Sequence, residues 1–220
     1  MAADDFDFDR LYSFRHRRTD QARRQDVWNQ IAPYLHRAMG NPARVLDPAA
    51  GRGEFINAVA AAERWVVDAV DYADARYGED VKLLLGDVLE MELPSEYFDG
   101  ILVSNLLEHF ASQLEVGRFL KKMMRATAPG GHIAVLGPNF RYCAKDYFDC
   151  ADHTVALTER SVEEHLYVAG FTVIRSVPRF LPFSFSGRLP NAPVLVRAYL
   201  GLPLAWKLIG KQFLVVARRD

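Results

Sequence analysis

The sequence has little of what marks a secreted or membrane-spanning protein. Its 220 residues include two cysteines, Cys143 and Cys150, which are too few for a disulfide framework and are expected to be free thiols in a reducing compartment. The first residues are acidic, whereas a secretory leader begins with basic ones. No uninterrupted apolar run has the length that crosses a bilayer. We therefore expect a cytoplasmic protein.

The chain also lacks an excess of charge of either sign. It has 27 Lys and Arg against 28 Asp and Glu, so its overall balance favours no nucleic-acid partner. It contains no internal repeat, no Walker loop, no Ser-His-Asp order and no metal-ligand spacing, and we expect no metal cofactor. Half of the residues are hydrophobic, and the length suits one globular domain with a full core.

The most informative stretch that is present is VLDPAAGRGEF, residues 45–55. Its first two residues follow a short Gly/Asn/Pro break and predict the end of a buried strand, which Asp47 closes. Small residues follow, and an apolar, Ala-rich run over 55–62 predicts a helix. A strand, a tight glycine turn and a helix allow the backbone to approach a nucleotide-like ligand closely.

Two known patterns compete for this turn. The dinucleotide fingerprint G-x-G-x-x-G, laid on Ala49, Gly51 and Glu54, fails at its first and last positions. The pattern D-x-G-x-G-x-G resembles the first motif of class I S-adenosylmethionine-dependent methyltransferases. Asp47, Gly51 and Gly53 match this pattern, and Ala49 departs from it. A carboxylate such as Asp47 suits a ligand that carries an ammonium and a sulfonium, and Phe55 opens the helix beside it. An ordinary turn with incidental glycines is the less favoured alternative.

The next two predicted strands supply further cofactor candidates. Residues 65–71 predict a strand that ends in an acid, which can accept hydrogen bonds from both ribose hydroxyls. We assign this role to Asp71, because Asp68 lies within the strand pattern, and we place Tyr72 against the adenine. After a third strand at 81–85, the resemblance implies that Asp87 takes the adenine amino group and the backbone of Val88 a ring nitrogen. A turn or cap role is the alternative for Asp87.

The fourth predicted strand, residues 98–105, is a near-continuous apolar run, as in a parallel strand that is buried on both faces. Asn105 and Leu106 at its carboxyl end are expected at the cofactor. The Glu-His pair that follows resembles the fourth motif of small-molecule methyltransferases. It does not resemble the Asn/Asp-Pro-Pro-Tyr/Phe of enzymes that methylate nucleobase or glutamine amines. His109 is expected either to line the cofactor pocket or to cap the following helix.

The remaining elements complete the predicted fold. We expect an α/β fold with a doubly wound, seven-stranded, mostly parallel sheet. The resemblance implies that its last strand lies antiparallel beside the sixth. The expected elements are a helix at 113–127, a Pro-Gly-Gly turn at 129–131, a strand at 132–136, a helix that begins after an N-cap at Thr158 and ends at Gly170, and strands at 172–177 and 213–217.

Candidates for the acceptor side follow the fifth strand. His153, in an Asp-His-Thr segment that we expect to be a loop, can take a proton from a hydroxyl as the methyl group arrives. A structural hydrogen bond to the next helix is the equal alternative for His153. The residues that we expect to bind the substrate are Asn139, Arg141, Tyr142, Tyr147 and Arg179.

Two segments flank or interrupt the predicted cofactor domain, which we place at 41–220. Residues 1–40 predict an acidic arm and an arginine-bearing amphipathic helix that covers the site, although such a run is more often a solvated helix face. Residues 181–210 form an insertion between the last two strands, with two short amphipathic helices. We favour a substrate cover with an apolar lining; a dimer face and a lipid-contacting surface are the alternatives.

The sequence therefore predicts an S-adenosylmethionine-dependent methyltransferase that acts on a small-molecule acceptor, an oxygen atom being the favoured site. A non-catalytic S-adenosylmethionine-binding scaffold, methylation of RNA or protein through the arginine-rich segment, and a lipid-linked substrate are the rival interpretations. Either a monomer or a homodimer is compatible with the sequence.

Overall fold

A single sheet of seven strands runs through the computed structural model, which describes residues 7, 10–11, 14–15, 17, 20–70, 77–183 and 192–220. The strand order is β3-β2-β1-β4-β5-β7-β6. All neighbours are parallel except for β7, which is antiparallel to both β5 and β6. The predicted fold class is thereby confirmed. The strands are β1 (Arg44–Asp47), β2 (Glu63–Asp68), β3 (Val81–Leu85), β4 (Phe98–Ser104), β5 (Thr127–Pro138), β6 (Thr172–Leu181) and β7 (Gln212–Arg218).

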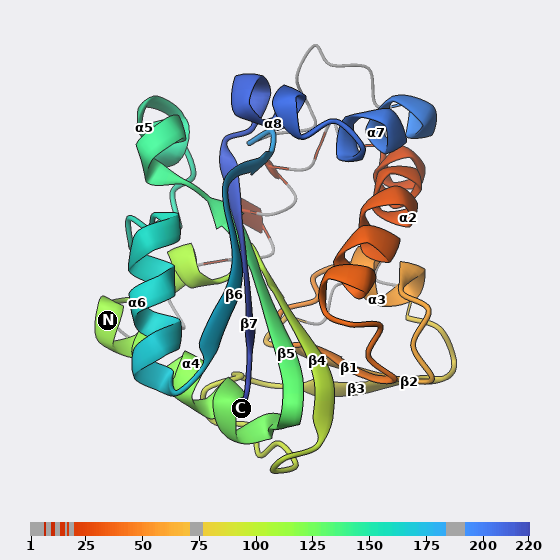
Figure 1. Cartoon of the computed structure of the whole chain (residues 1–220), viewed down its shortest axis with the longest axis vertical. Coiled ribbons are helices and arrows are strands. Elements are labelled where there is room, and N and C mark those ends of the chain that lie inside the picture. The colour runs from red at the N-terminus through yellow and green to blue at the C-terminus, as the bar shows by residue number, and fades with distance from the viewer. Residues whose placement is uncertain are drawn as a thin grey trace.

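Helices cover both faces of this sheet (Figure 1). On one face lie α4 and α6, and on the other lie α2 and α3. The helical elements are α2 (Gln21–Ala38), α3 (Glu54–Ala58), the 3₁₀ turn η2 (Leu107–His109), α4 (Gln113–Ala126), α5 (Phe140–Tyr147), α6 (Glu159–Ala169), α7 (Pro193–Leu200) and α8 (Pro203–Ile209). No helix within the described ranges is both long and apolar enough to cross a membrane.

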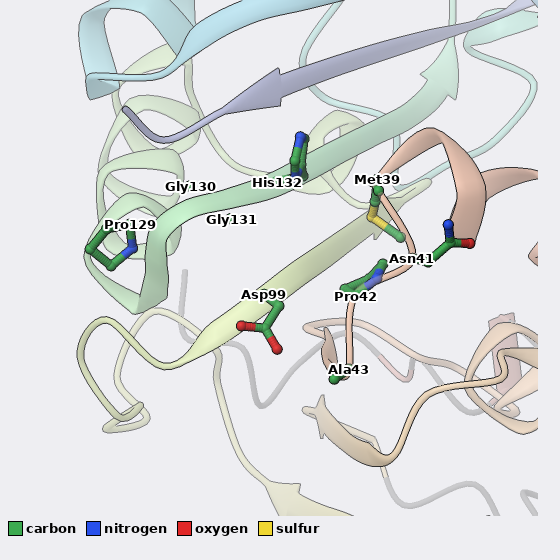
Figure 2. A pocket seen from close by; sticks show the side chains of 10 residues that line it. Met39, Asn41, Pro42, Ala43, Asp99, Pro129, Gly130, Gly131 and His132 are labelled. Atoms are coloured by element: carbon green, nitrogen blue, oxygen red, sulfur yellow. The ribbon is translucent and has the colours of Figure 1, made fainter.

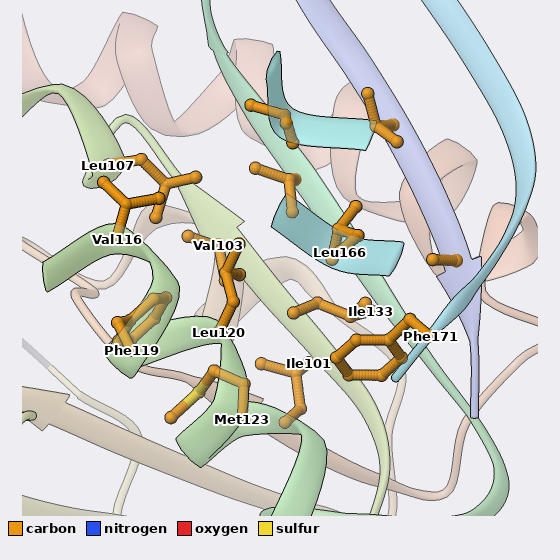
Figure 3. Packing of buried hydrophobic residues seen from close by; sticks show 14 of the residues in the cluster. Ile101, Val103, Leu107, Val116, Phe119, Leu120, Met123, Ile133, Leu166 and Phe171 are labelled. Atoms are coloured by element: carbon orange, nitrogen blue, oxygen red, sulfur yellow. The ribbon is translucent and has the colours of Figure 1, made fainter. Parts of the chain in front are cut away.

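The central strands supply side chains to two separate cores. In β4, Ile101 and Val103 face α4 and α6, whereas Leu102 between them faces α2 and α3. Figure 3 shows Phe119 of α4 and Leu166 of α6 packed over the first of these faces. Because alternate residues of a strand point to opposite faces, both faces of β4 must be apolar, which explains its continuous hydrophobic run.

Several expected element boundaries are confirmed. The side chain of Thr158 accepts a hydrogen bond from the backbone of Ser161 and caps α6. That helix ends at Gly170, whose positive φ of 108° favours glycine. The insertion contains the two expected short helices, α7 and α8.

Three other boundaries were wrong. The second strand ends at Asp68 rather than at residue 71. The first crossover helix ends at Ala58 rather than at residue 62, because Val59 becomes extended and buries its side chain in the core. The fifth strand already begins at Thr127, so the Pro-Gly-Gly segment is a bulge within it; Gly130 adopts a φ of 76° there.

The segment directly after the fifth strand is a helix, for which we had no expectation, whereas the Asp-His-Thr segment lies outside any helix or strand, as expected. The side chain of Asn139 accepts a hydrogen bond from the backbone of Arg141 and begins α5. At Cys143 the backbone leaves helical geometry, with a φ of −130°. A helix this short and irregular has no clear apolar period, which is why the sequence pattern did not indicate it.

The insertion leaves the sheet at the edge where β5 ends. Pro138, the last residue of β5, is paired with Gln212, the first residue of β7, and Leu181 at the end of β6 is paired with the same residue. The helices α7 and α8 therefore lie at the carboxyl ends of the parallel strands (Figure 1). Ligands of open α/β sheets bind at this edge.

Candidate functional site

The glycine turn after β1 has the geometry that the sequence predicts. Gly51 and Gly53 both have positive φ, 56° and 82°. A Cβ on Gly53 would lie 2.9 Å from the ring of Tyr77 and 3.0 Å from the side-chain nitrogen of Asn57. Glycine is thus required at this position by both backbone angle and space. The hydroxyl of Tyr77 donates to the carbonyl of Gly51 at 2.7 Å and fixes the turn.

The acid at the carboxyl end of β2 is Asp68. One carboxylate oxygen accepts a hydrogen bond from the backbone N–H of Gly51 at 2.7 Å, and the other accepts one from Val70 at 3.0 Å. Asp68 thereby ties the second strand to the glycine turn. The strand ends three residues before the expected position, so that Asp68, expected within the strand, stands at its end. Asp71 and Tyr72, to which we assigned the ribose and adenine, lie outside the described residues.

Three carboxylates meet around this turn. Asp47 is 3% exposed, and burial raises its pKa to about 8, with the nearby charges of Asp68 and Glu54 adding to the effect. Burial likewise raises the pKa of Asp68. Buried carboxylates cost free energy unless a positive charge or hydrogen-bond donors compensate them. A ligand that brings an ammonium and a sulfonium would supply that positive charge.

The start of α3 is covered by the N-terminal helix. Arg24 of α2 lies 2.5 Å from the Glu54 carboxylate, and Gln25 donates to the backbone carbonyl of Glu54 at 3.0 Å. Phe55, one of the predicted cofactor residues, is buried with its ring 6.3 Å from that of Trp28. The predicted helix within residues 1–40 therefore lies directly against the glycine turn.

The other predicted cofactor residues have varied surroundings. The backbone N–H of Ala49 donates to Asp47 at 3.3 Å. Asp87 is exposed and accepts a hydrogen bond from the backbone of Leu89 at 2.8 Å, so the alternative turn role is present, while Val88 is buried in the core. Asn105 is exposed and has a φ of 50°, the left-handed region that asparagine tolerates better than most residues. Leu106 beside it is half-buried.

A second group of polar side chains lies beyond the carboxyl ends of β4 and β5. His109 directs its Nδ1 toward Asp152, at 3.2 Å from the carboxylate and 3.1 Å from the carbonyl. Its Nε2 lies 4.0 Å from the carboxylate of Glu108. The ring of His153 is 5.0 Å from that of His109, and the guanidinium of Arg15 forms an ion pair with Asp152. The sequence predicted both histidines at the site but not the two acids or Arg15.

Backbone hydrogen bonds hold this group together. The carbonyl of Glu108 accepts from the backbone N–H groups of Thr154 and Val155 at 2.9 and 3.2 Å. The Thr154 hydroxyl also donates to the carbonyl of Phe110. These bonds join the end of β4 to a segment more than forty residues later, so the two histidines meet for reasons of tertiary structure.

The protonation of these groups follows from burial and from their mutual contacts. Burial lowers the pKa of His109, but the hydrogen bond to Asp152 and the charge of Glu108 outweigh it, so that its pKa is raised overall. The same contact with His109, together with Arg15, outweighs burial at Asp152 and lowers its pKa. Burial lowers the pKa of His153 to about 4 and raises the pKa of Glu108. His153 is therefore neutral near pH 7 and a weak proton acceptor.

Two of the predicted substrate-binding residues are buried and bonded within the fold. Asn139 is fully buried and donates to Glu159 and to the carbonyl of Pro178. Tyr147 is fully buried and donates to the carbonyl of Val155 at 2.6 Å. The structure gives both side chains a role in the fold, and their contact with a substrate stays a prediction.

The remaining three substrate candidates also have structural contacts. Arg179 donates to the carbonyls of Gly210 and Leu208 and closes the end of α8. Its guanidinium lies 4.9 Å from the centre of the Tyr142 ring. Arg141 is exposed and paired with Glu159 at 3.2 Å. Arg179 therefore holds the end of the insertion, and the substrate roles of these three residues stay predictions.

A surface hollow lies at the opposite edge of the sheet (Figure 2). It is bounded by the turn before β1, by Asp99 near the start of β4 and by the Pro-Gly-Gly bulge of β5. Asp99 forms an ion pair with Arg44, whose guanidinium and backbone N–H both donate hydrogen bonds to the Asp99 carboxylate. Because β1 runs away from this edge toward Asp47, the hollow is separate from the glycine turn.

Comparison with known proteins supports one family. A family model described as "Methyltransferase domain" matches residues 46–135, which include the glycine turn and the strands up to β5. No curated protein matches the chain.

Many solved structures share the fold. An S-adenosylmethionine-dependent methyltransferase from Mesorhizobium loti is 19% identical with a TM-score of 0.60, over 85% of this chain and 96% of that one. A possible histamine N-methyltransferase from Thermotoga maritima is 15% identical with a TM-score of 0.67, over 97% and 98%. The 1,6-didemethyltoxoflavin-N1-methyltransferase of Burkholderia thailandensis, solved with S-adenosylhomocysteine, is 22% identical with a TM-score of 0.59, over 100% and 91%.

Replacement of Asp47 by Asn tests the buried carboxylates. A carboxyl whose pKa is about 8 in the folded protein and near 3.8 when unfolded costs stability that increases as the pH rises between those values. We expect Asp47→Asn to be more stable than the wild type without ligand, by a margin that grows from pH 5 to pH 8 by up to about 1.4 kcal/mol per pH unit. Denaturant unfolding at the two pH values measures it; an equal margin at both would contradict the burial argument.

Proposed function

We propose that the chain is a class I S-adenosylmethionine-dependent methyltransferase, with S-adenosylmethionine as its methyl donor, and that it methylates an oxygen atom of a small-molecule acceptor. One observation carries the proposal. The glycine turn after β1 and the histidine group after β4 and β5 both lie at the carboxyl edge of one parallel sheet. A donor bound at the turn would thus have a set of acids and bases beside it.

The chain's own residues fit the donor. Gly53 packs closely against Tyr77 in a backbone conformation that favours glycine, and Asp47 and Asp68 are buried carboxyl groups near it whose ionised forms a bound cation would stabilise. We propose that Asp47, Gly51 and Gly53 hold the methionine portion, and that an acid at the end of β2 binds the ribose. The bound cofactor would supply a methyl group on a positively charged sulfur.

Asp68 and Asp71 are both candidates for the ribose. Asp68 stands at the end of β2, but both of its oxygens already accept backbone hydrogen bonds. Asp71 remains the candidate from the sequence, and Asp87 and Asn105 complete the proposed adenosine side.

The histidine group supports chemistry at an oxygen. A hydroxyl must lose its proton as it becomes an ether, and a base beside it accelerates that step. His109 is the better proton acceptor of the two histidines near neutral pH, because its pKa is raised while that of His153 is lowered. Asp152 would keep the His109 ring oriented, with Arg15 holding Asp152 in turn.

A lipid-linked acceptor is the second candidate, because the insertion carries exposed aliphatic side chains. In α8 and just before it, Leu202, Leu204 and Leu208 are 58%, 75% and 78% exposed, and Val194 of α7 is 76% exposed. Arg197 and Lys207 lie on the same two helices. Exposed apolar residues interleaved with basic ones are typical of helices that rest on anionic lipid.

Titration with S-adenosylhomocysteine, beside NADH as a control, tests the cofactor assignments. We expect binding of S-adenosylhomocysteine alone. Replacement of the ribose-binding acid by Ala should weaken the binding of S-adenosylhomocysteine at least about tenfold, which corresponds to 1.4 kcal/mol. The two acids to replace are Asp68 and Asp71. Unchanged affinity in Asp71→Ala with loss in Asp68→Ala would move the ribose role to Asp68. Unchanged affinity in both variants would contradict an acid at the end of β2.

Transfer of radiolabelled methyl to matched hydroxyl and amine acceptors tests the reaction. With an accepted hydroxyl compound, His109→Ala should lower kcat by about 10²–10⁴-fold and leave the affinity for S-adenosylhomocysteine intact. His165→Ala is the matched control, since His165 is bonded to Gln113 on the surface between α4 and α6. Transfer to amines alone would overturn the choice of oxygen. Donor binding without transfer to any acceptor would favour a non-catalytic scaffold.

Sedimentation with vesicles tests the lipid alternative. The chain should sediment with vesicles that contain anionic phospholipid, and a double change of Leu204 and Leu208 to Ser should abolish this because it removes the exposed apolar contact. Exposed Leu114 on α4, changed to Ser, is the control. Equal sedimentation of all three proteins would exclude α8 as the contact.

A further inference from the structure

We propose that Glu108, His109 and His153 bind a divalent transition-metal ion on the acceptor side of the site. The site itself rests on the positions of these three side chains; its role in holding an acceptor oxygen rests on the proposed function. It also departs from our expectation from the sequence, in which no metal-ligand spacing was visible, because Glu108 and His153 are far apart along the chain.

The distances suit a shared ligand. One ligand atom from each of the three side chains lies within 4.8 Å of the other two. Around an ion with bonds of about 2.0–2.2 Å, ligand atoms lie roughly 3 Å apart. Rotations of the three side chains that move each ligand atom by about 1 Å would therefore complete the site.

Burial leaves these groups in need of a cation. The Glu108 side chain is 2% exposed, and its carboxylate lies 4.0 Å from Nε2 of His109. Nδ1 of His153 is buried and has no hydrogen-bond partner within the parts of the chain that the structure describes, although the ring also bonds to the backbone of Tyr147. Buried polar atoms are normally satisfied, and an unpaired imidazole nitrogen is a ready metal ligand.

The surroundings of His109 match those of metal-binding histidines. Its Nδ1 faces the carboxylate of Asp152 at 3.2 Å, and its Nε2 faces Glu108. A histidine that binds a metal through one nitrogen usually donates the other N–H to a carboxylate, which fixes the ring and makes it a stronger ligand. The ion pair with Arg15 keeps Asp152 in place.

The backbone provides room and rigidity. Thr154 and Val155 bind the carbonyl of Glu108, so that the neighbouring His153 is held beside it. A Cβ placed on Gly137 would lie 3.6 Å from the Glu108 carboxylate and 3.0 Å from the ring of Phe213. Glycine at the end of β5 thus leaves space for the carboxylate to move.

The ligand set indicates the class of ion. Two imidazoles and one carboxylate suit Zn²⁺ or another first-row divalent ion such as Mn²⁺ or Co²⁺, and not Ca²⁺, which takes oxygen ligands. Three protein ligands leave a position open for the acceptor. A hydroxyl bound there would lose its proton to solvent more easily, so that with the ion bound the metal, and not Nε2 of His109, would activate the hydroxyl. Its oxygen would form the new C–O bond while the S–CH₃ bond breaks, with the electron pair passing to sulfur.

Binding of Co²⁺ as a spectroscopic probe, to chain stripped with a chelator, tests the site without any assay of activity. We expect visible absorption of cobalt bound to nitrogen ligands, and competition by Zn²⁺. His153→Ala should weaken Zn²⁺ binding at least tenfold, whereas the control His165→Ala should not, because His165 lies outside the group. Glu108→Gln and His153→Asn are further variants, and circular dichroism with S-adenosylhomocysteine binding verifies that each is folded.

Equal Zn²⁺ affinity of the wild type, His153→Ala and His109→Ala would overturn the inference. Its failure is distinguishable from that of the proposed function. Binding of S-adenosylhomocysteine and methyl transfer that persist in excess chelator would remove the metal and leave the methyltransferase. Site-specific metal binding without methyl transfer to an oxygen would leave the metal site and remove the proposed acceptor.

Discussion

The parallel pairing of β1 with β4 and of β4 with β5 is the constraint on which the site depends. It brings the carboxyl ends of three strands that are far apart in sequence to one edge. The glycine turn leaves from the first of these strands, the Glu108–His109 turn from the second, and α5 with the segment up to His153 follows the third. Since both faces of β4 are buried by helices, this edge is where polar groups of the sheet meet solvent and ligands. The chemistry is thus placed by strand register, and the helices serve to keep that register fixed.

The same edge contains several groups that lower the stability of the fold when no ligand is bound. Asp47 and Glu108 are nearly inaccessible, and burial raises the pKa of each. Gly51, Gly53 and Asn105 hold positive φ within a few residues of these acids. Such costs persist at functional sites when the surrounding packing determines them. A cationic donor at the turn and a metal ion at Glu108 would each stabilise the ionised form of one of these two buried carboxyl groups. The unfavourable groups therefore point to two separate ligands at one edge.

How much the sequence could predict depended on how local each feature is. The turn at Asp47, Gly51 and Gly53 is encoded by adjacent residues and was predicted in detail, as was the cap at Thr158. The end of the second strand was placed three residues too late, because strand ends carry no sharp local signal, and the bond between Asp68 and the glycine turn was not predicted. The contact of Arg15 with Asp152 joins residues 137 positions apart. No periodicity or motif encodes such a pairing, so only the folded chain could place it beside the histidines.

The insertion has an inner surface, which packs on the sheet and α2, and an outer surface that is exposed. Its inner side is fixed: the ring of Trp206 lies 5.1 Å from that of Phe180 on β6 and 6.0 Å from that of Tyr34 on α2. Trp206 also donates to the carbonyl of Tyr199, and Tyr199 to that of Phe180. These contacts join α8 to both the sheet and the N-terminal helix and hold it at the carboxyl edge. Its outer leucines contribute nothing to that anchoring. The proposed contact with lipid concerns only this outer face, where Leu204 and Leu208 are exposed, and leaves the inner contacts of Trp206 in place.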